Sequence, residues 1–338
     1  MHHHSEPEHG SLPRREFLRR SSLGAVALAA LGTGIHTSRA ASVLAQLAGD
    51  PEHAMDPHSS AHPLAQPVAA IGVLGRRVVA VGGVRGDARV WSRSDLGRPW
   101  AQVAGPEAFP DGTALTGLGI DHGRAVVVGC TGPDHQVRPV VFSSSDLRTW
   151  GGESGIGSFP GVLTGVAFSG GRGLAVGARF AEADVEEPIE TVAYRRGLAG
   201  RWVRTSVPGV RPVQHGAVTL RAGVADRLVL GLTDVHGLSL YSAPGVEGPW
   251  RSMGAPKVGM PLSPVAAASV GGSTLLAGVD ARDQARFWRH VGRSWIEIDP
   301  PTGVGSSVKV RSLRRSGSEL LVAGSRGHGG YLREVKVS

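Results

Sequence analysis

The chain has 338 residues, of which 50 are glycine and 22 are proline. Glycine makes up about 15% of the chain, twice the share usual in globular proteins, whereas the hydrophobic fraction of 41% is ordinary. This composition argues against a helical bundle and favours a fold with many tight turns. The single cysteine, Cys130, excludes an internal disulfide framework and a zinc site made of several thiolates.

Residues 1–40 have the character of an export signal. A basic segment with the pair Arg14 and Arg15 precedes a modest apolar run over residues 23–35, and small residues follow at Ser38 and Ala40. The run is too short for a transmembrane helix, which needs about 20 apolar residues. The segment resembles a twin-arginine signal peptide. This resemblance implies passage through the twin-arginine translocase in the folded state, a secreted, periplasmic or cell-envelope location, and no stable membrane insertion.

The charge balance excludes one class of partner. The first 40 residues carry five arginines and three glutamates, so their removal lowers the net charge from +8 to +6. The remaining charge is scattered, whereas a nucleic-acid-binding protein presents a concentrated basic face. We therefore predict no nucleic-acid partner, and we expect a monomer. Arginine outnumbers lysine by 33 to three, which indicates a bacterium with a GC-rich genome.

The rest of the chain is repetitive. Residues 41–66 show no periodicity and read as a flexible linker. After them, a short apolar or β-branched run that ends in glycine recurs every 46 to 54 residues. A second recurring feature is a strand with an aromatic residue, a short turn and then tryptophan, as in Phe142 and Trp150. The recurring glycines are Gly82, Gly129, Gly177, Gly231, Gly278 and Gly324.

Each repeat reads as four short strands. An innermost strand (115–120, 163–168 and 265–270) precedes the strand ending in glycine, the aromatic strand and an outer strand that starts at tryptophan. A period of 40–50 residues with such strands is typical of a β-propeller. We predict an all-β fold over residues 67–338, a six-bladed β-propeller of four-stranded antiparallel blades, with seven blades as the alternative. In the sixth repeat the aromatic strand starts at Tyr331 and the outer strand is missing. The linker or a rearranged C-terminal tail could supply it.

Two turns before tryptophan contain serine and aspartate, as in Ser144-Ser145-Asp146-Leu147-Arg148-Thr149-Trp150. They resemble the Asp-box repeat of sialidase-type propellers, in which serine and aspartate bond the turn backbone and the aromatic residue packs between blades. The resemblance implies structural roles for Ser94, Asp95, Trp100, Ser144, Asp146 and Trp150. The chain lacks the Arg-Ile-Pro motif of sialidases, and its three tyrosines all occupy the repeated third-strand position, so sialidase activity is not expected.

The face opposite these turns is where propellers usually bind ligands. It carries the hairpins between second and third strands, and every blade contributes an acidic residue or histidine there. The candidates are Asp87, Asp134, His135, Asp234, His236, Asp280 and His328. The alternative is that hairpin tips favour aspartate for turn geometry and solvation. Phe109 and Phe159 in inter-blade loops line a binding funnel, or they plug these loops onto the blades.

These features predict an exported bacterial β-propeller that binds a glycan, peptide or partner protein without catalysis. The rival hypothesis is an extracellular carbohydrate hydrolase or lyase that uses carboxylates of the rim, and a third is a purely structural module. We predict no cofactor, although the rim side chains could hold a metal ion. No catalytic residue follows from the sequence.

Overall fold

The structure is a computed structural model, and it describes most of the chain after residue 65. The predicted signal peptide with Arg14 and Arg15, and the predicted linker up to residue 65, lie outside the described residues. Within the described part, no helix is long and apolar enough to cross a membrane. The described residues are 66–94, 98–133, 136–181, 184–207, 209–210, 217–222, 227–234, 237–256, 263–270, 272–280, 284–305, 307–316, 319–327 and 329–336.

The strands form six antiparallel sheets in chain order. Blade 1 contains β1 (Val68–Leu74), β2 (Arg77–Gly82), β3 (Arg89–Arg93) and β4 (Ala101–Ala104), and the short 3-10 helix η1 (Pro106–Ala108) follows it. Blade 2 contains β5 (Ala114–Asp121), β6 (Arg124–Thr131), β7 (Arg138–Ser144) and β8 (Gly151–Gly152). Blade 3 contains β9 (Gly161–Ser169), β10 (Arg172–Ala181), β11 (Asp184–Arg196) and β12 (Trp202–Thr205).

The second half of the ring repeats this arrangement. Blade 4 contains β13 (Ala217–Ala222), β14 (Leu228–Asp234), β15 (Gly237–Ala243) and β16 (Arg251–Ser252). Blade 5 contains β17 (Ser263–Val270), β18 (Ser273–Val279), β19 (Ala285–Val291) and β20 (Ser294–Ile298). Blade 6 contains β21 (Val308–Ser316), β22 (Glu319–Arg326) and β23 (Gly329–Lys336).

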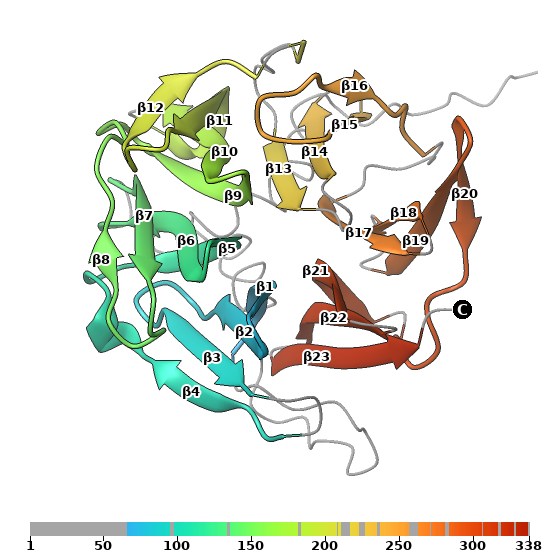
Figure 1. The fold of residues 1–338 in the computed structure, drawn as a ribbon, viewed down its shortest axis with the longest axis horizontal. Helices are drawn as coiled ribbons and strands as arrows, with labels where there is room; N and C mark the ends of the chain where they lie inside the picture. Colours follow the sequence, from blue (N-terminus) through green and yellow to red (C-terminus); the bar gives the residue numbers. More distant parts are fainter. Residues whose placement is uncertain are drawn as a thin grey trace, which may run out of the picture.

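The six sheets are arranged as blades around a common axis (Figure 1). In every blade, each strand pairs with the next one in sequence, so the sheet is a simple meander. The first five sheets have four strands, and the sixth has three among the residues that the structure describes. The predicted all-β, six-bladed propeller is confirmed, and predicted innermost strands such as 115–120 match their observed counterparts to within about two residues.

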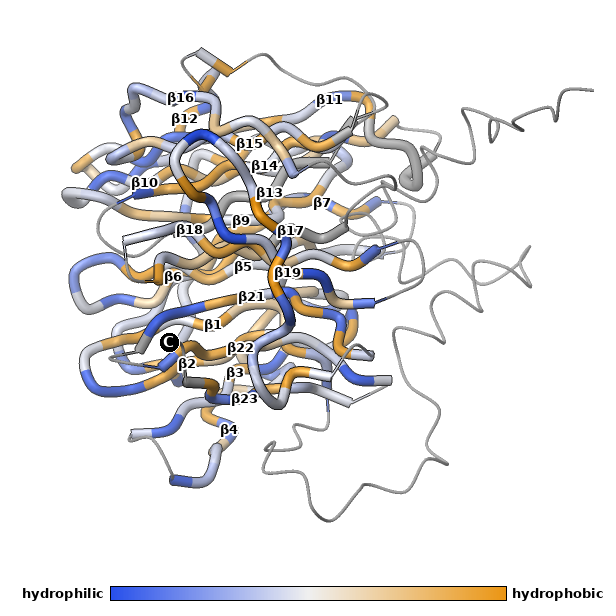
Figure 2. Tube along the Cα trace, turned by 90° about the vertical axis from the view of Figure 1, so that its right-hand side faces the viewer, coloured by the Kyte–Doolittle hydropathy of each residue, from blue (hydrophilic) through white to orange (hydrophobic). Residues whose placement is uncertain are grey.

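The hydrophobic core is divided among the interfaces between blades. Buried residues form at least one cluster at each of the six interfaces, and each cluster takes side chains from two neighbouring blades. Each blade contributes to two interfaces because neighbouring residues in a strand point to opposite faces of the sheet. In β19, for example, Phe287 and Trp288 belong to different interface clusters. Figure 2 shows hydrophobic residues along the strands and many hydrophilic residues at the turns. A blade therefore buries both faces only inside the ring.

The recurring glycines allow a close approach of the first two strands. In five of the six blades the first strand has a bulge or register shift beside the glycine of the second strand. A Cβ at Gly129 would lie 1.9 Å from the carbonyl oxygen of Ala114, which leaves no room for a side chain. The prediction that the second strand ends at glycine is wrong in five blades, because only β2 ends there. A Cβ added at Gly82, Gly177 or Gly324 would likewise lie less than 2.5 Å from a backbone oxygen of the first strand or the residue before it.

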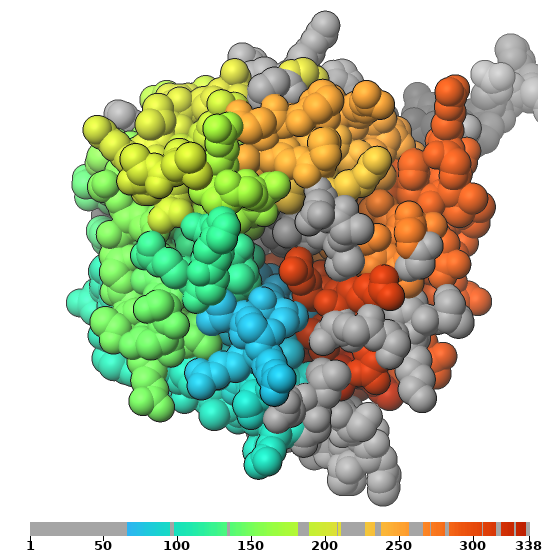
Figure 3. Space-filling model, in the orientation of Figure 1, coloured from blue at the N-terminus to red at the C-terminus, as the bar shows by residue number. Residues whose placement is uncertain are grey.

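Side-chain packing closes the ring between the sixth blade and the first. The blue β1 and the red β21 and β22 lie side by side in Figure 1, and residues of the same colours meet in Figure 3. Ile71 N–H donates a hydrogen bond to Ser312 Oγ over 3.2 Å. Trp91 of blade 1 packs in one buried cluster with Leu321 and Leu332 of blade 6. Among the described residues, the sixth sheet recruits no strand from another part of the chain.

Candidate functional site

The meander gives the ring two faces that carry different turns. In an antiparallel meander, the turns after the first and third strands lie at one end and the turn after the second lies at the other. We call the end with the turns between third and fourth strands the 3–4 face, and the opposite end the 2–3 face. The predicted ligand-binding rim belongs to the 2–3 face.

Two of the predicted polar rim residues have described side chains. Asp87 Oδ1 lies 2.9 Å from Arg89 Nη2, and its Oδ2 accepts a hydrogen bond from Gln66 Nε2 over 3.1 Å. Asp280 Oδ1 accepts a hydrogen bond of 3.0 Å from the backbone N–H of Gln284, within its own hairpin. Asp134, His135, His236 and His328 lie outside the described residues, and only the backbone of Asp234 is described.

The predicted rim metal site stays a prediction. No group of three or more His, Cys, Asp or Glu suited to a metal ion occurs among the residues that the structure describes. Four of the seven polar candidates are outside that part of the chain. The two described carboxylates, Asp87 and Asp280, lie in different blades and contact neighbours within or next to their own hairpins.

The two loop phenylalanines pack against repeated aromatic residues. Phe109 is 7% exposed, and its ring lies 5.4 Å from that of Phe142 and 5.7 Å from that of Trp150. Phe159 is partly exposed and is stacked 6.3 Å from Tyr194. Both rings therefore fasten inter-blade loops onto the blades. Their predicted role as ligand contacts stays a prediction.

The turn after β7 is held by one exposed carboxylate. Asp146 Oδ1 accepts hydrogen bonds from Ser144 Oγ at 2.9 Å and from the backbone N–H groups of Arg148 and Thr149 at 2.9 and 2.8 Å. Bonds from these backbone amides, first of all that of Thr149, hold the pKa of Asp146 well below its usual range.

The same turn contains a strained residue and ends at the expected tryptophan. Leu147 has a φ of +67°, a conformation that is uncommon outside glycine, and its N–H donates to Ser144 Oγ over 2.8 Å. Trp150 Nε1 in turn donates to the Leu147 carbonyl over 3.2 Å. In the corresponding turn of blade 1, Asp95 lies outside the described residues, Ser94 is exposed, and Arg93 lies over the Trp100 ring at 4.9 Å.

A cavity opens at the outer part of blade 5 on the 2–3 face. It has a volume of about 590 Å³ and is lined by the start of β19, the end of β20 and the following loop. Arg286 Nη1 lies 3.2 Å from Glu297 Oε1, and its Nε lies 3.6 Å from Asp280 Oδ2. Gln284 and Asp299 also line the cavity, so amide, guanidinium and carboxylate groups surround it. The cavity adjoins the predicted rim residue Asp280.

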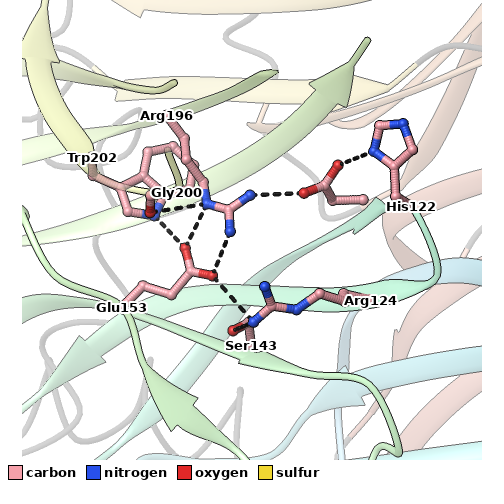
Figure 4. A network of polar contacts seen from close by, with 8 residues as sticks. His122, Arg124, Ser143, Glu153, Arg196, Gly200 and Trp202 are labelled. Atoms are coloured by element: carbon pink, nitrogen blue, oxygen red, sulfur yellow. Dashed lines mark hydrogen bonds and ion pairs between the residues drawn. The ribbon is translucent and has the colours of Figure 1, made fainter. Parts of the chain in front are cut away.

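A buried ionic network joins blades 2 and 3 on the 3–4 face (Figure 4). The guanidinium of Arg196 contacts both Glu153 oxygens, with Nε 3.0 Å from Oε2 and Nη2 3.1 Å from Oε1. Its Nη1 also lies 2.7 Å from Asp121 Oδ2, and Trp202 Nε1 donates to Glu153 Oε2 over 2.6 Å. The Arg196 and Glu153 side chains are both 8% exposed. The opposite charges of this network therefore pair with each other, and the network joins blade 2 to blade 3.

The sequence analysis did not find this network, although the repeat contains a signal for it. Arg196 stands two residues after the third-strand aromatic Tyr194, and Arg93 stands two residues after Trp91. Arg93 is also buried and forms an ion pair with Glu334 of blade 6. Two interfaces thus use arginine at one repeat position to bind a carboxylate of the preceding blade.

Cys130 belongs to the core and not to a site. It is fully buried beside Ala114 and Phe180, and burial raises the pKa of its thiol to about 12. Because the thiolate is the reactive form, this thiol is inert at neutral pH.

The six antiparallel sheets around one axis define the chain as a six-bladed β-propeller. No protein-family model and no curated protein matches its sequence. Solved structures do resemble it. The SapL1 lectin, solved with alpha-methyl fucoside, has a TM-score of 0.55 and 12% identity over 81% of this chain and 94% of the lectin.

Two further structures have similar scores. The fucose-specific lectin of Aleuria aurantia has a TM-score of 0.51 and 13% identity over 82% of this chain and 97% of the lectin. The Trypanosoma rangeli sialidase, solved with the inhibitor DANA, has a TM-score of 0.53 and 10% identity over 82% of this chain. The match spans 55% of the sialidase chain. At such identities, these likenesses show the fold alone.

Proposed function

We propose that the chain is an exported bacterial propeller that binds a glycan, without catalysis, in the cavity of blade 5 on the 2–3 face. The observation that supports this most is the lining of the 590 Å³ cavity. Gln284, Arg286 and Glu297 present donors and acceptors at its wall, and sugar hydroxyls require both. Ile298 and Pro300 add apolar surface for the C–H face of a sugar ring. Among the structural neighbours, one lectin is solved with alpha-methyl fucoside and another is named fucose-specific. Both add support at the level of the fold.

A glycan array followed by calorimetry on the purified chain tests this proposal. We expect Glu297→Gln and Gln284→Ala to weaken binding of the selected glycan by about tenfold or more, because the first turns an acceptor oxygen into a donor and the second removes the side-chain amide. Asp111→Asn is the matched control, since it changes an exposed carboxylate in the loop after blade 1. Equal affinity in all three variants would exclude this cavity.

The hydrolase or lyase is the second candidate because two carboxylates, Glu297 and Asp299, line the same cavity. Incubation of the selected glycan with the chain, followed by mass spectrometry of the products, distinguishes the two functions. Product formation that Glu297→Gln abolishes, with binding retained, would replace the lectin proposal by the enzyme.

We also assign the Ser144–Trp150 turn to the Asp-box type. Its supporting observation is the set of hydrogen bonds from the turn to Ser144 and Asp146. As an Asp box, this turn has a structural role and lies on the face away from the proposed glycan cavity.

For export we propose the twin-arginine translocase, on the basis of the pair Arg14 and Arg15. Replacing both with lysine is expected to leave uncleaved precursor inside the cell, as seen by immunoblotting of cell fractions. Unchanged export of this double variant would refute the proposed route.

A further inference from the structure

A second cavity lies between blades 4 and 5, on the 3–4 face and thus opposite the proposed glycan cavity. Its volume is about 760 Å³, within the range of small-ligand sites. The wall contains Arg227, Arg251 and Arg293 together with His290, and five serine or threonine residues add hydroxyl groups. No aspartate or glutamate is among its described lining residues.

The three arginines of this cavity are not neutralised by described neighbours. Arg227, Arg251 and Arg293 are exposed, and no ion pair or side-chain hydrogen bond in the described part of the structure involves them. Most of the other arginines that have a described partner lie next to carboxylates, as Arg172 and Arg195 do beside Glu247. Three guanidinium groups around one hollow create a local positive potential that attracts an anion.

The equivalent place between blades 2 and 3 holds an internal carboxylate. Strand register makes Glu153 and Met253 equivalent, since each follows a residue paired with the third-strand aromatic. Both also donate a backbone hydrogen bond of 2.9 Å to the preceding third strand. Blade 2 thus supplies the carboxylate that binds Arg196, whereas blade 4 supplies the neutral side chain of Met253 at that place.

The partner of the carboxylate is replaced as well. His290 pairs with Trp295 across β19 and β20, as Arg196 pairs with Trp202 across β11 and β12. Trp295 Nε1 donates to the Met253 carbonyl over 3.1 Å, so the tryptophan keeps its position against the preceding blade. The buried Nε2 of His290 has no hydrogen-bond partner among the residues that the structure describes. His290 therefore takes the place of Arg196 at an interface where the described cavity lining contains no carboxylate.

We propose that this cavity binds an acidic sugar residue through its carboxylate or sulfate group. The arginines, as planar donors, bind the oxyanion. The serine and threonine hydroxyls, which donate and accept, bind the hydroxyl groups of the sugar. No aromatic ring other than that of His290 is among the described lining residues. This favours a saccharide over a nucleotide, whose base would need a stacking surface.

Calorimetry at low ionic strength with the full chain tests the ligand class. Glucuronate and glucose 6-sulfate distinguish the two oxyanions, and glucose, inorganic sulfate and a short polyglutamate peptide are the comparison ligands. We expect at least one acidic sugar to bind about tenfold or more tightly than glucose and than sulfate, and its binding to weaken as NaCl is added. Binding of glucose with equal affinity, or preference for the peptide, would overturn the proposal.

Substitution of Met253 tests the location. Met253→Glu places an internal carboxylate where Glu153 stands in blade 2, so it should compete with the ligand and weaken binding about tenfold or more. Met253→Gln introduces a side chain of the same shape as glutamate but without its charge, and it should retain binding. Equal loss in both variants, with both folded by circular dichroism, would contradict the proposed competition.

The arginines provide a second test that does not depend on Met253. Arg251→Ser and Arg293→Ser should each weaken binding about tenfold, whereas Arg148→Ser, an exposed arginine on the same face of blade 2, should have no effect. Equal weakening of binding by all three substitutions would show that binding depends only on the net charge of the protein. Glu297→Gln alters the glycan cavity on the other face and should leave this site intact, so the two proposals fail separately.

Discussion

At the scale of single residues, Asp146 shows how one exposed carboxylate organises a turn. Three hydrogen bonds to a single oxygen atom, two of them from the backbone, fix the segment in which Leu147 adopts a positive φ. A positive φ costs a non-glycine residue free energy, so the backbone would leave this conformation without these hydrogen bonds. The turn brings Trp150 to the aromatic cluster of Phe109 and Phe142.

The lowered pKa of Asp146 predicts a pH-dependent contribution to stability. A carboxyl group with a folded-state pKa below its unfolded value stabilises the fold above the unfolded value of about 3.9. That contribution is lost as the pH falls below 3.9 towards the folded-state pKa. We therefore expect Asp146→Asn to lower Tm at pH 6 and the difference from the unsubstituted chain to shrink towards pH 3. Thermal unfolding followed by circular dichroism at several pH values measures it.

Asp111→Asn is the control for this experiment, because Asp111 is also exposed and none of the described hydrogen bonds uses its carboxylate. It should change Tm little over the whole pH range. A difference for Asp146→Asn that is constant with pH would show that the charge of Asp146 is not what stabilises the turn.

At the scale of the strand, the recurring glycines are explained by contact with the neighbouring strand. The sequence pattern correctly located the second strand of each blade, but it ended this strand at the glycine. The register shows a bulge in the first strand instead, with carbonyl oxygens such as that of Ala114 turned towards the glycine Cα. A sequence lists which residue recurs, whereas a bulge depends on the pairing of two strands.

Gly129→Ala tests this explanation. The added methyl group would meet the Ala114 carbonyl at 1.9 Å, so we expect a loss of about 1–3 kcal/mol in the free energy of unfolding, or more if β5 cannot shift. Gly151→Ala, in β8, meets nothing within 4 Å and should be close to neutral. Urea denaturation of both variants measures the difference. Similar small effects would mean that the bulge does not require glycine.

At the scale of the whole molecule, stability depends on closure of the ring. The interface of blades 6 and 1 has its own buried core, with Leu321 fully buried against blade 1. The first and last blades meet there through side chains, including the bond from Ile71 to Ser312, whereas within a blade the strands share backbone hydrogen bonds.

Leu321→Ala is expected to destabilise the chain by about 2–5 kcal/mol, the usual cost of removing a buried leucine side chain. Leu174→Ala, at the interface of blades 3 and 4, is the matched substitution within the ring and should cost a similar amount. Denaturation followed by both fluorescence and circular dichroism measures the two values. A cost below about 1 kcal/mol for Leu321→Ala alone would indicate that the closing interface is open in solution.

The sequence by itself determined the number of blades, the order of strands within them and the repeated positions of glycine and tryptophan. These features are local and recur with one period, so each repeat supports the interpretation of the others. Only the tertiary structure decided which charges meet and where hollows open. Arg196 and Asp121 are 75 residues apart in sequence and join across two blades. The replacement of Glu153 and Arg196 by Met253 and His290 becomes visible only when neighbouring blades are in place, because the pocket between them belongs to neither repeat alone.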